Sequence, residues 1–75
     1  MSRVKAQAPW RSGGVVKTST GMDVLFLEHE QLGADPRSDE EFANALAQSA
    51  LPNSVLRASW RTWDRIAVRL YVVKA

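Results

Sequence analysis

Four arginines in the C-terminal third of the chain recur at intervals of four residues. They are Arg57, Arg61, Arg65 and Arg69. If residues 55 to 73 are extended, every second side chain points the same way, so the arginines share a face with Trp63 and Tyr71. Guanidinium groups bind phosphates and aromatic rings stack on bases, as in surfaces that bind single-stranded nucleic acid. These residues are therefore the candidate site for nucleic acid or for a partner protein.

The same spacing also suits a helix, on which the arginines would form a slowly drifting stripe. In that alternative Pro52 stands in the first turn of a second helix that runs to about Ala67. Two consecutive helices would loosely resemble a helix-turn-helix motif, although the usual turn glycine is missing. We favour strands, because valine, isoleucine and aromatic residues are frequent here.

Other residue types give little support to catalysis. His29 is the only histidine, and its neighbours Glu28 and Glu30 point to the opposite face if the strand continues. Gly13 and Gly14 lack the lysine and the spacing of a phosphate-binding loop, and no serine lies in a nucleophile elbow. We therefore expect no enzyme activity, no catalytic residue, no cofactor and no metal site.

Length and composition limit the architecture. The 75 residues make one small domain, and without cysteine no disulfide supports its core. A core this small is stabilised when a second subunit covers part of it. We therefore expect a homo-oligomer, in the first place a homodimer. No apolar run approaches the ~20 residues that span a bilayer, so we expect no membrane partner and a cytoplasmic location.

The first half of the domain is predicted to be a β-hairpin that follows an N-terminal arm. Residues 1 to 14 are expected to form a mobile arm that ends at a glycine pair. Strands beginning at Val15 and at Met22 then flank Thr20-Gly21. Residues 24 to 27 are all apolar, which predicts a strand covered on both faces, with another subunit as one possible cover.

A helix is predicted over residues 39 to 50. Ser38 and Glu41 have the spacing of a capping box, in which each side chain bonds the other residue's amide. Small and apolar residues follow at helical spacing, and Pro52 disfavours helical geometry at Leu51.

The last segment is predicted to be a second hairpin with a three-residue loop that pairs Thr62 with Ile66. The side chains opposite the arginines are expected to face the core: Leu56, Ala58, Trp60, Ile66, Val68, Leu70 and Val72.

The sequence thus predicts a small α+β domain of order ββαββ over residues 15 to 75, with a hairpin followed by two helices and a strand as the alternative. Its expected role is a non-enzymatic binding module that contacts nucleic acid through the arginine and aromatic face. The alternative is a protein-binding module or inhibitor, of the compact kind found in phages and mobile elements, that uses an aromatic patch or edge-strand pairing.

Overall fold

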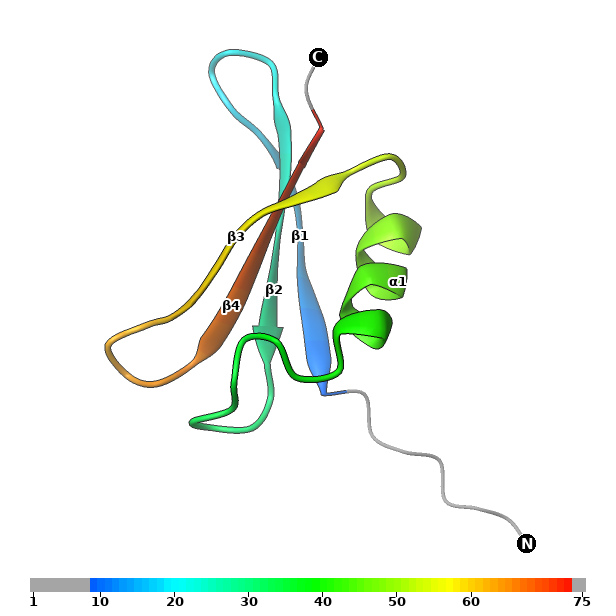
Figure 1. Ribbon diagram of the computed structural model, residues 1–75. Helices are drawn as coiled ribbons and strands as arrows, with labels where there is room; N and C mark the ends of the chain where they lie inside the picture. Colours follow the sequence, from blue (N-terminus) through cyan, green and yellow to red (C-terminus); the bar gives the residue numbers. More distant parts are fainter. Residues whose placement is uncertain (1–8, 74–75) are drawn as a thin grey trace, which may run out of the picture.

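A computed structural model describes residues 9–73 as a four-stranded antiparallel sheet with one helix (Figure 1). The elements are β1 (Trp10–Lys17), β2 (Asp23–His29), α1 (Glu40–Ala50), β3 (Val55–Arg61) and β4 (Ala67–Val73). The sheet order β1-β2-β4-β3 makes β1 and β3 the outer strands. The α+β class and the ββαββ order are confirmed. The two-helix alternative is wrong, because residues 55 to 61 form a strand.

The first strand begins earlier than predicted. Residues 10 to 14, expected in a mobile arm, belong to β1, and residues 1 to 8 lie outside the described residues. The pairing of β1 with β2 shifts between Ser12 and Val15, and Gly14 has a φ of 98°. The glycine pair therefore makes a β-bulge inside the strand rather than ending an arm, since glycine alone adopts such a φ readily.

The turn of the second hairpin is the predicted one. The Thr62 amide donates to the Ile66 carbonyl at 2.9 Å, which encloses a three-residue loop, and the Arg65 amide donates to the Thr62 carbonyl at 2.8 Å. Arg65 has a φ of 67° and so takes the left-handed position that glycine or asparagine usually occupies in such loops.

The helix ends at Ala50, as predicted, but it does not begin with a capping box. Its N-cap is Asp39, with a φ of 50° and no side-chain cap hydrogen bond. The Ser38 amide donates to the Asp35 carbonyl at 2.9 Å, so it belongs to the preceding turn and is not available to Glu41. The tight turn before the helix therefore replaces the expected cap.

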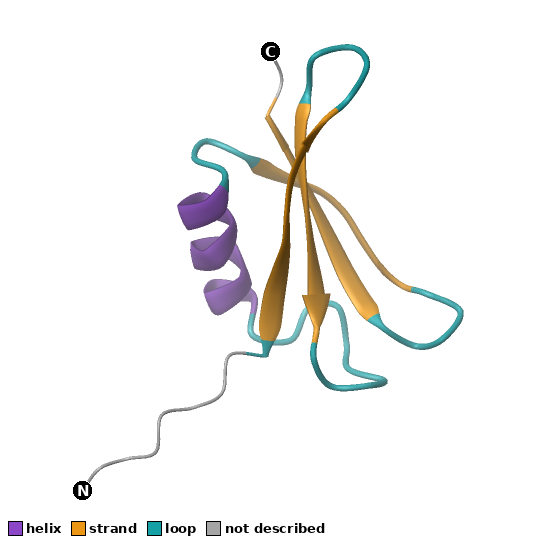
Figure 2. Cartoon of the chain, turned by 180° about the vertical axis from the view of Figure 1, so that it is seen from behind, coloured by secondary structure: helices purple, strands orange, loops and turns teal. Residues whose placement is uncertain are grey.

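Figure 2 shows the helix lying along one face of the sheet, which we call the covered face. Ala43 and Ala47 are fully buried against it, and their small side chains allow a close approach to the strands. The covered face is formed by Trp10, Leu25, Leu27, His29, Ala67, Arg69 and Tyr71, all of which are buried. Within the part of the chain that the structure describes, no helix is long and apolar enough to cross a membrane.

The seven side chains predicted to face the core do not form the layer under the helix. In β4 the helix covers the alternate set, which contains Arg69 and Tyr71, so Val68, Leu70 and Val72 point the other way. Leu56 leaves the predicted set altogether, because a bulge between Leu56 and Ala58 places it opposite Tyr71. Alternation tells which residues share a face, and it does not tell which face the helix covers.

Candidate interaction surface

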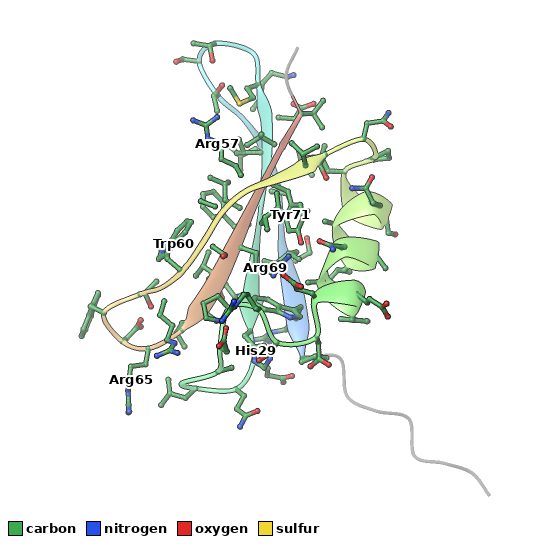
Figure 3. All side chains as sticks on the ribbon, in the orientation of Figure 1. His29, Arg57, Trp60, Arg65, Arg69 and Tyr71 are labelled. Atoms are coloured by element: carbon green, nitrogen blue, oxygen red, sulfur yellow. The ribbon has the colours of Figure 1, made fainter. Side chains whose placement is uncertain are left out.

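The structure does not place the six residues predicted to form one basic and aromatic face on a common face, and Figure 3 labels four of them, Arg57, Arg65, Arg69 and Tyr71. Arg57 lies at the bulge near the start of β3, and Arg65 lies in the turn beyond the other end of that strand. Arg61 is on the covered side, where its Nε donates to the Ala34 carbonyl at 3.1 Å. The prediction of a common face is wrong, because the bulge and the turn both interrupt the alternation on which it was based.

Arg69 is buried, with only 1% of its surface exposed. Its Nε donates to the Tyr71 hydroxyl at 2.9 Å, its Nη1 to the Pro36 carbonyl at 2.9 Å and its Nη2 to Asn44 Oδ1 at 3.3 Å. A carboxylate oxygen of Glu40 lies 3.7 Å from Nη1. The guanidinium group is therefore satisfied from within the chain, as a buried charge must be.

Aromatic rings surround the same guanidinium group. Its central carbon lies 5.8 Å from the centre of the Trp10 ring and 5.7 Å from that of Tyr71, within the range of a cation–π contact. Trp10 in turn donates from its Nε1 to the Ser38 carbonyl at 2.8 Å. Arg69 and Tyr71 thus fasten β4 to α1 and to the turn before it, and neither is accessible to a ligand.

His29 is a packed residue of the covered face. It is 5% exposed, its ring meets Trp10 edge to face at 4.8 Å, and its Nδ1 accepts from the Gln31 amide at 3.0 Å. Among the described residues, no group of three or more histidine, cysteine, aspartate or glutamate side chains is placed to hold a metal ion.

The other side of the sheet, which we call the open face, carries almost only apolar side chains. Its register places them in rows across the strands: Val16, Val24, Val72 and Val55; then Phe26, Leu70 and Ala58; then Val68 and Trp60. No layer of the described chain lies over these rows, because α1 is on the opposite side. Val55 is 62% exposed and Val16 is 57% exposed.

The two aromatic residues of the open face contact each other across β4. The rings of Phe26 and Trp60 meet edge to face with centres 6.4 Å apart, and each residue keeps about two fifths of its surface exposed. Val68, which pairs with Trp60 in the sheet, and Val72, which lies between Val24 and Val55, are buried by these neighbours. The open face is therefore a surface of apolar side chains that pack against one another.

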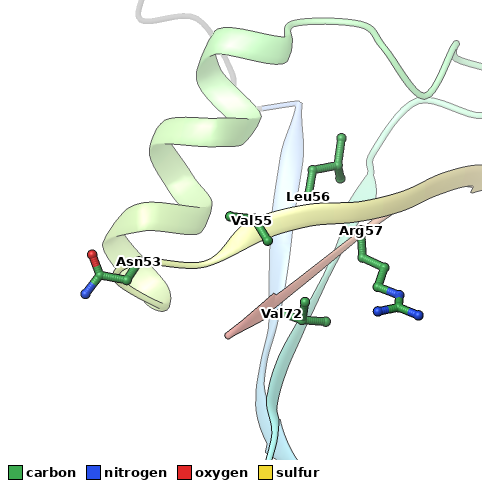
Figure 4. Close-up of a pocket in the computed structure, with 5 residues that line it drawn as sticks. All are labelled: Asn53, Val55, Leu56, Arg57 and Val72. Carbon is green, nitrogen blue, oxygen red and sulfur yellow. The ribbon is translucent and has the colours of Figure 1, made fainter. Parts of the chain in front are cut away.

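The charged side chains of the open face lie toward the two ends of the sheet, and one of them, Glu28, lies opposite Val68 in the last row. Arg11 and Glu28 pair across β1 and β2 near one end of the sheet. Arg57 lies at the other end, beside a shallow hollow of about 570 Å³ that is lined by Asn53, Val55, Leu56, Arg57 and Val72. Figure 4 shows Arg57 and Val72 on one side of β3 and Leu56 on the other.

Trp63 is almost fully exposed, with 93% of its surface accessible. It lies in the three-residue turn between β3 and β4, beyond the end of both strands. The sequence analysis did not select Val16, Val24, Phe26 or Val55. The signal that pointed to Val24 and Phe26 was the continuous apolar run of residues 24 to 27, which predicted a second cover for β2 and does not include Val16 or Val55.

No protein-family model matches this chain, and the comparisons with curated proteins and with solved structures give no significant match. The geometry of the open face is therefore the basis for a functional proposal.

Proposed function

We propose that the chain is a non-enzymatic protein-binding module that acts through the open face. The observation that supports this proposal is an apolar sheet face, with Phe26 and Trp60 in contact, that no layer of the described chain covers. Exposed apolar patches with a charged margin are typical of protein interfaces, and large aromatic residues contribute most of the binding energy there. A second copy of the chain is one such partner, in line with the homo-oligomer expected from the sequence.

The alternative of a nucleic-acid surface has less support. Two of its six residues, Arg69 and Tyr71, are buried under the helix. Binding of single strands requires successive stacking platforms along a basic groove, and only Trp63 remains as an accessible aromatic residue of that set. Asp64 lies in the same turn and would repel phosphate.

A photo-crosslinking experiment tests the proposal. A photoreactive amino acid replaces Val16 on the open face or, as a control, Ala45 on the exposed side of α1. We expect position 16 to crosslink to protein in the native host, the second copy included, and the crosslink to disappear when Trp60 is changed to lysine. Equal crosslinking from both positions, or none from position 16, would contradict the proposal.

Titration with labelled mixed-sequence DNA and RNA at several salt concentrations tests the alternative. We expect no tight binding at low salt. Tight binding that falls steeply with salt and that is lost when Arg61 and Arg65 are changed to alanine would favour the nucleic-acid function instead. A cytoplasmic location remains part of the proposal and is tested by fractionating cells of the native host.

A further inference from the structure

We infer that the protein which occupies the open face is a second copy of this chain, packed sheet against sheet about a two-fold axis. The inference rests on the proposed function and names its partner. It follows from the area of the open face, the distribution of its charges and the small size of the core.

The area of the open face allows a small dimer interface. Four strands spaced about 4.8 Å apart, each of seven or eight residues rising about 3.4 Å, give a projected area of roughly 450 Å². The accessible area is larger than the projected one, because Phe26, Trp60, Val16 and Val55 stand above the sheet. Two copies packed face to face would therefore bury about 1,000 Å² in total, which is the size that a biological interface should reach and is smaller than the roughly 1,200 Å² of the smaller stable interfaces.

The charges of the open face favour self-association. A two-fold interface places the same surface on both partners, so a patch of a single charge would repel itself. Here the rows through Val72 and Leu70 hold no charged residue, the row of Val68 and Trp60 continues with Glu28 and Arg11, and Arg57 lies at the other end of the sheet. Two copies can meet across the apolar rows without placing like charges at the centre.

The core under the helix is too small to account for all of the apolar side chains. The helix covers one side of the sheet only, so the open face has no second layer among residues 9–73. The described chain is a plate whose smallest dimension is 16 Å. A second copy would make Val68, Leu70 and Trp60 part of a sheet-on-sheet core about 10 Å thick, as in two-layer β proteins. Small chains without disulfides commonly complete their cores in this way.

The test is the mass of the full chain in solution. Sedimentation equilibrium over a range of concentrations should give twice the 8.3 kDa mass of one chain. Changing Phe26 or Trp60 to lysine should weaken the dimer at least 100-fold, because the charge would be buried at the interface. Trp63→Lys is the matched control, since it alters a tryptophan outside the open face and should leave the dimer unchanged.

Folding of each variant is checked by circular dichroism. Val55→Lys provides a second probe should either aromatic variant unfold, because Val55 is the most exposed member of the rows and is not required by the fold of one copy. A monomeric wild-type chain at high concentration, or a dimer that folded Trp60→Lys and Val55→Lys leave intact, would overturn the inference. A monomer whose position 16 still crosslinks to a different protein would overturn it while supporting the proposed function. A monomeric chain whose position 16 crosslinks to no protein would overturn both the dimer inference and the proposed function.

Discussion

Arg69 and Tyr71, two residues apart on β4, donate to the same oxygen, Oδ1 of Asn44 on α1, at 3.3 Å and 2.7 Å. This shared acceptor explains why the helix lies over the more polar of the two faces of β4. The guanidinium and hydroxyl groups need partners that only the helix and the turn before it supply, whereas the valines and leucine of the other face need only an apolar neighbour. The polar contacts therefore select the orientation of the helix.

Removing the Arg69 guanidinium should destabilise the fold. Arg69→Met keeps much of the side-chain volume but leaves the Pro36 carbonyl without its donor and removes the contact with Glu40. We expect a loss of about 2–4 kcal/mol in the free energy of unfolding, measured by chemical denaturation. Arg57→Met is the control and should change stability by less than about 0.5 kcal/mol, because Arg57 is exposed. Equal effects of the two changes would show that Arg69 has no special structural role.

The start of the helix gives a second prediction. Ser38→Ala should cost little stability, since the Ser38 hydroxyl makes no cap hydrogen bond, whereas loss of a working N-cap costs about 1 kcal/mol. Asp39→Gly should stabilise the fold by up to about 1 kcal/mol, because Asp39 has a positive φ of 50°. Thermal unfolding of both variants checks these values. A large loss of stability in Ser38→Ala would instead indicate that the Ser38 side chain caps the helix, as the sequence predicted.

Arg65 should respond to substitution according to its backbone conformation. With a φ of 67°, it occupies a region that glycine adopts without strain and β-branched residues avoid. We expect Arg65→Gly to raise stability by about 0.5 kcal/mol and Arg65→Val to lower it by about 1 kcal/mol or more. The same glycine substitution at Arg61, inside β3, should be destabilising. Were all three changes neutral, the turn would not have the conformation described.

Stability at acid pH should depend on Asp35. The Arg37 amide donates to its carboxylate at 2.8 Å and, as the main cause, holds the pKa of Asp35 below its ordinary value of 3.8. A carboxyl group whose pKa is lower in the folded chain stabilises the fold above its unfolded pKa, and this contribution is lost as the pH falls through the folded pKa. Asp35→Asn should therefore flatten the decline in stability below about pH 4. Between pH 6 and 7 the slopes of wild type and variant should be equal, and a difference there would point to another group.

Local chemistry allowed much of this fold to be predicted. Pro52 marked the end of the helix, and the alternation around Thr62 and Ile66 gave the loop length of the second hairpin. The prediction of the candidate site was wrong because it depended on contacts between residues that are far apart in the sequence. The sequence shows that Arg69 and Tyr71 share a face, but the decision that this face lies inward depends on Asn44 and Trp10, which are distant in sequence. Trp10 was placed in the expected arm, and nothing in the sequence predicted that its ring would lie beside Arg69.

The bulges at Gly14 and Arg57 have a consequence for how far assembly can proceed. They lie in the two outermost strands, where they interrupt the even spacing of amide and carbonyl groups that would template another strand. Growth by edge pairing into ribbons or fibres is thereby hindered, while contact through the flat side stops once that side is occupied. The proposed binding through the open face would therefore end at a closed dimer.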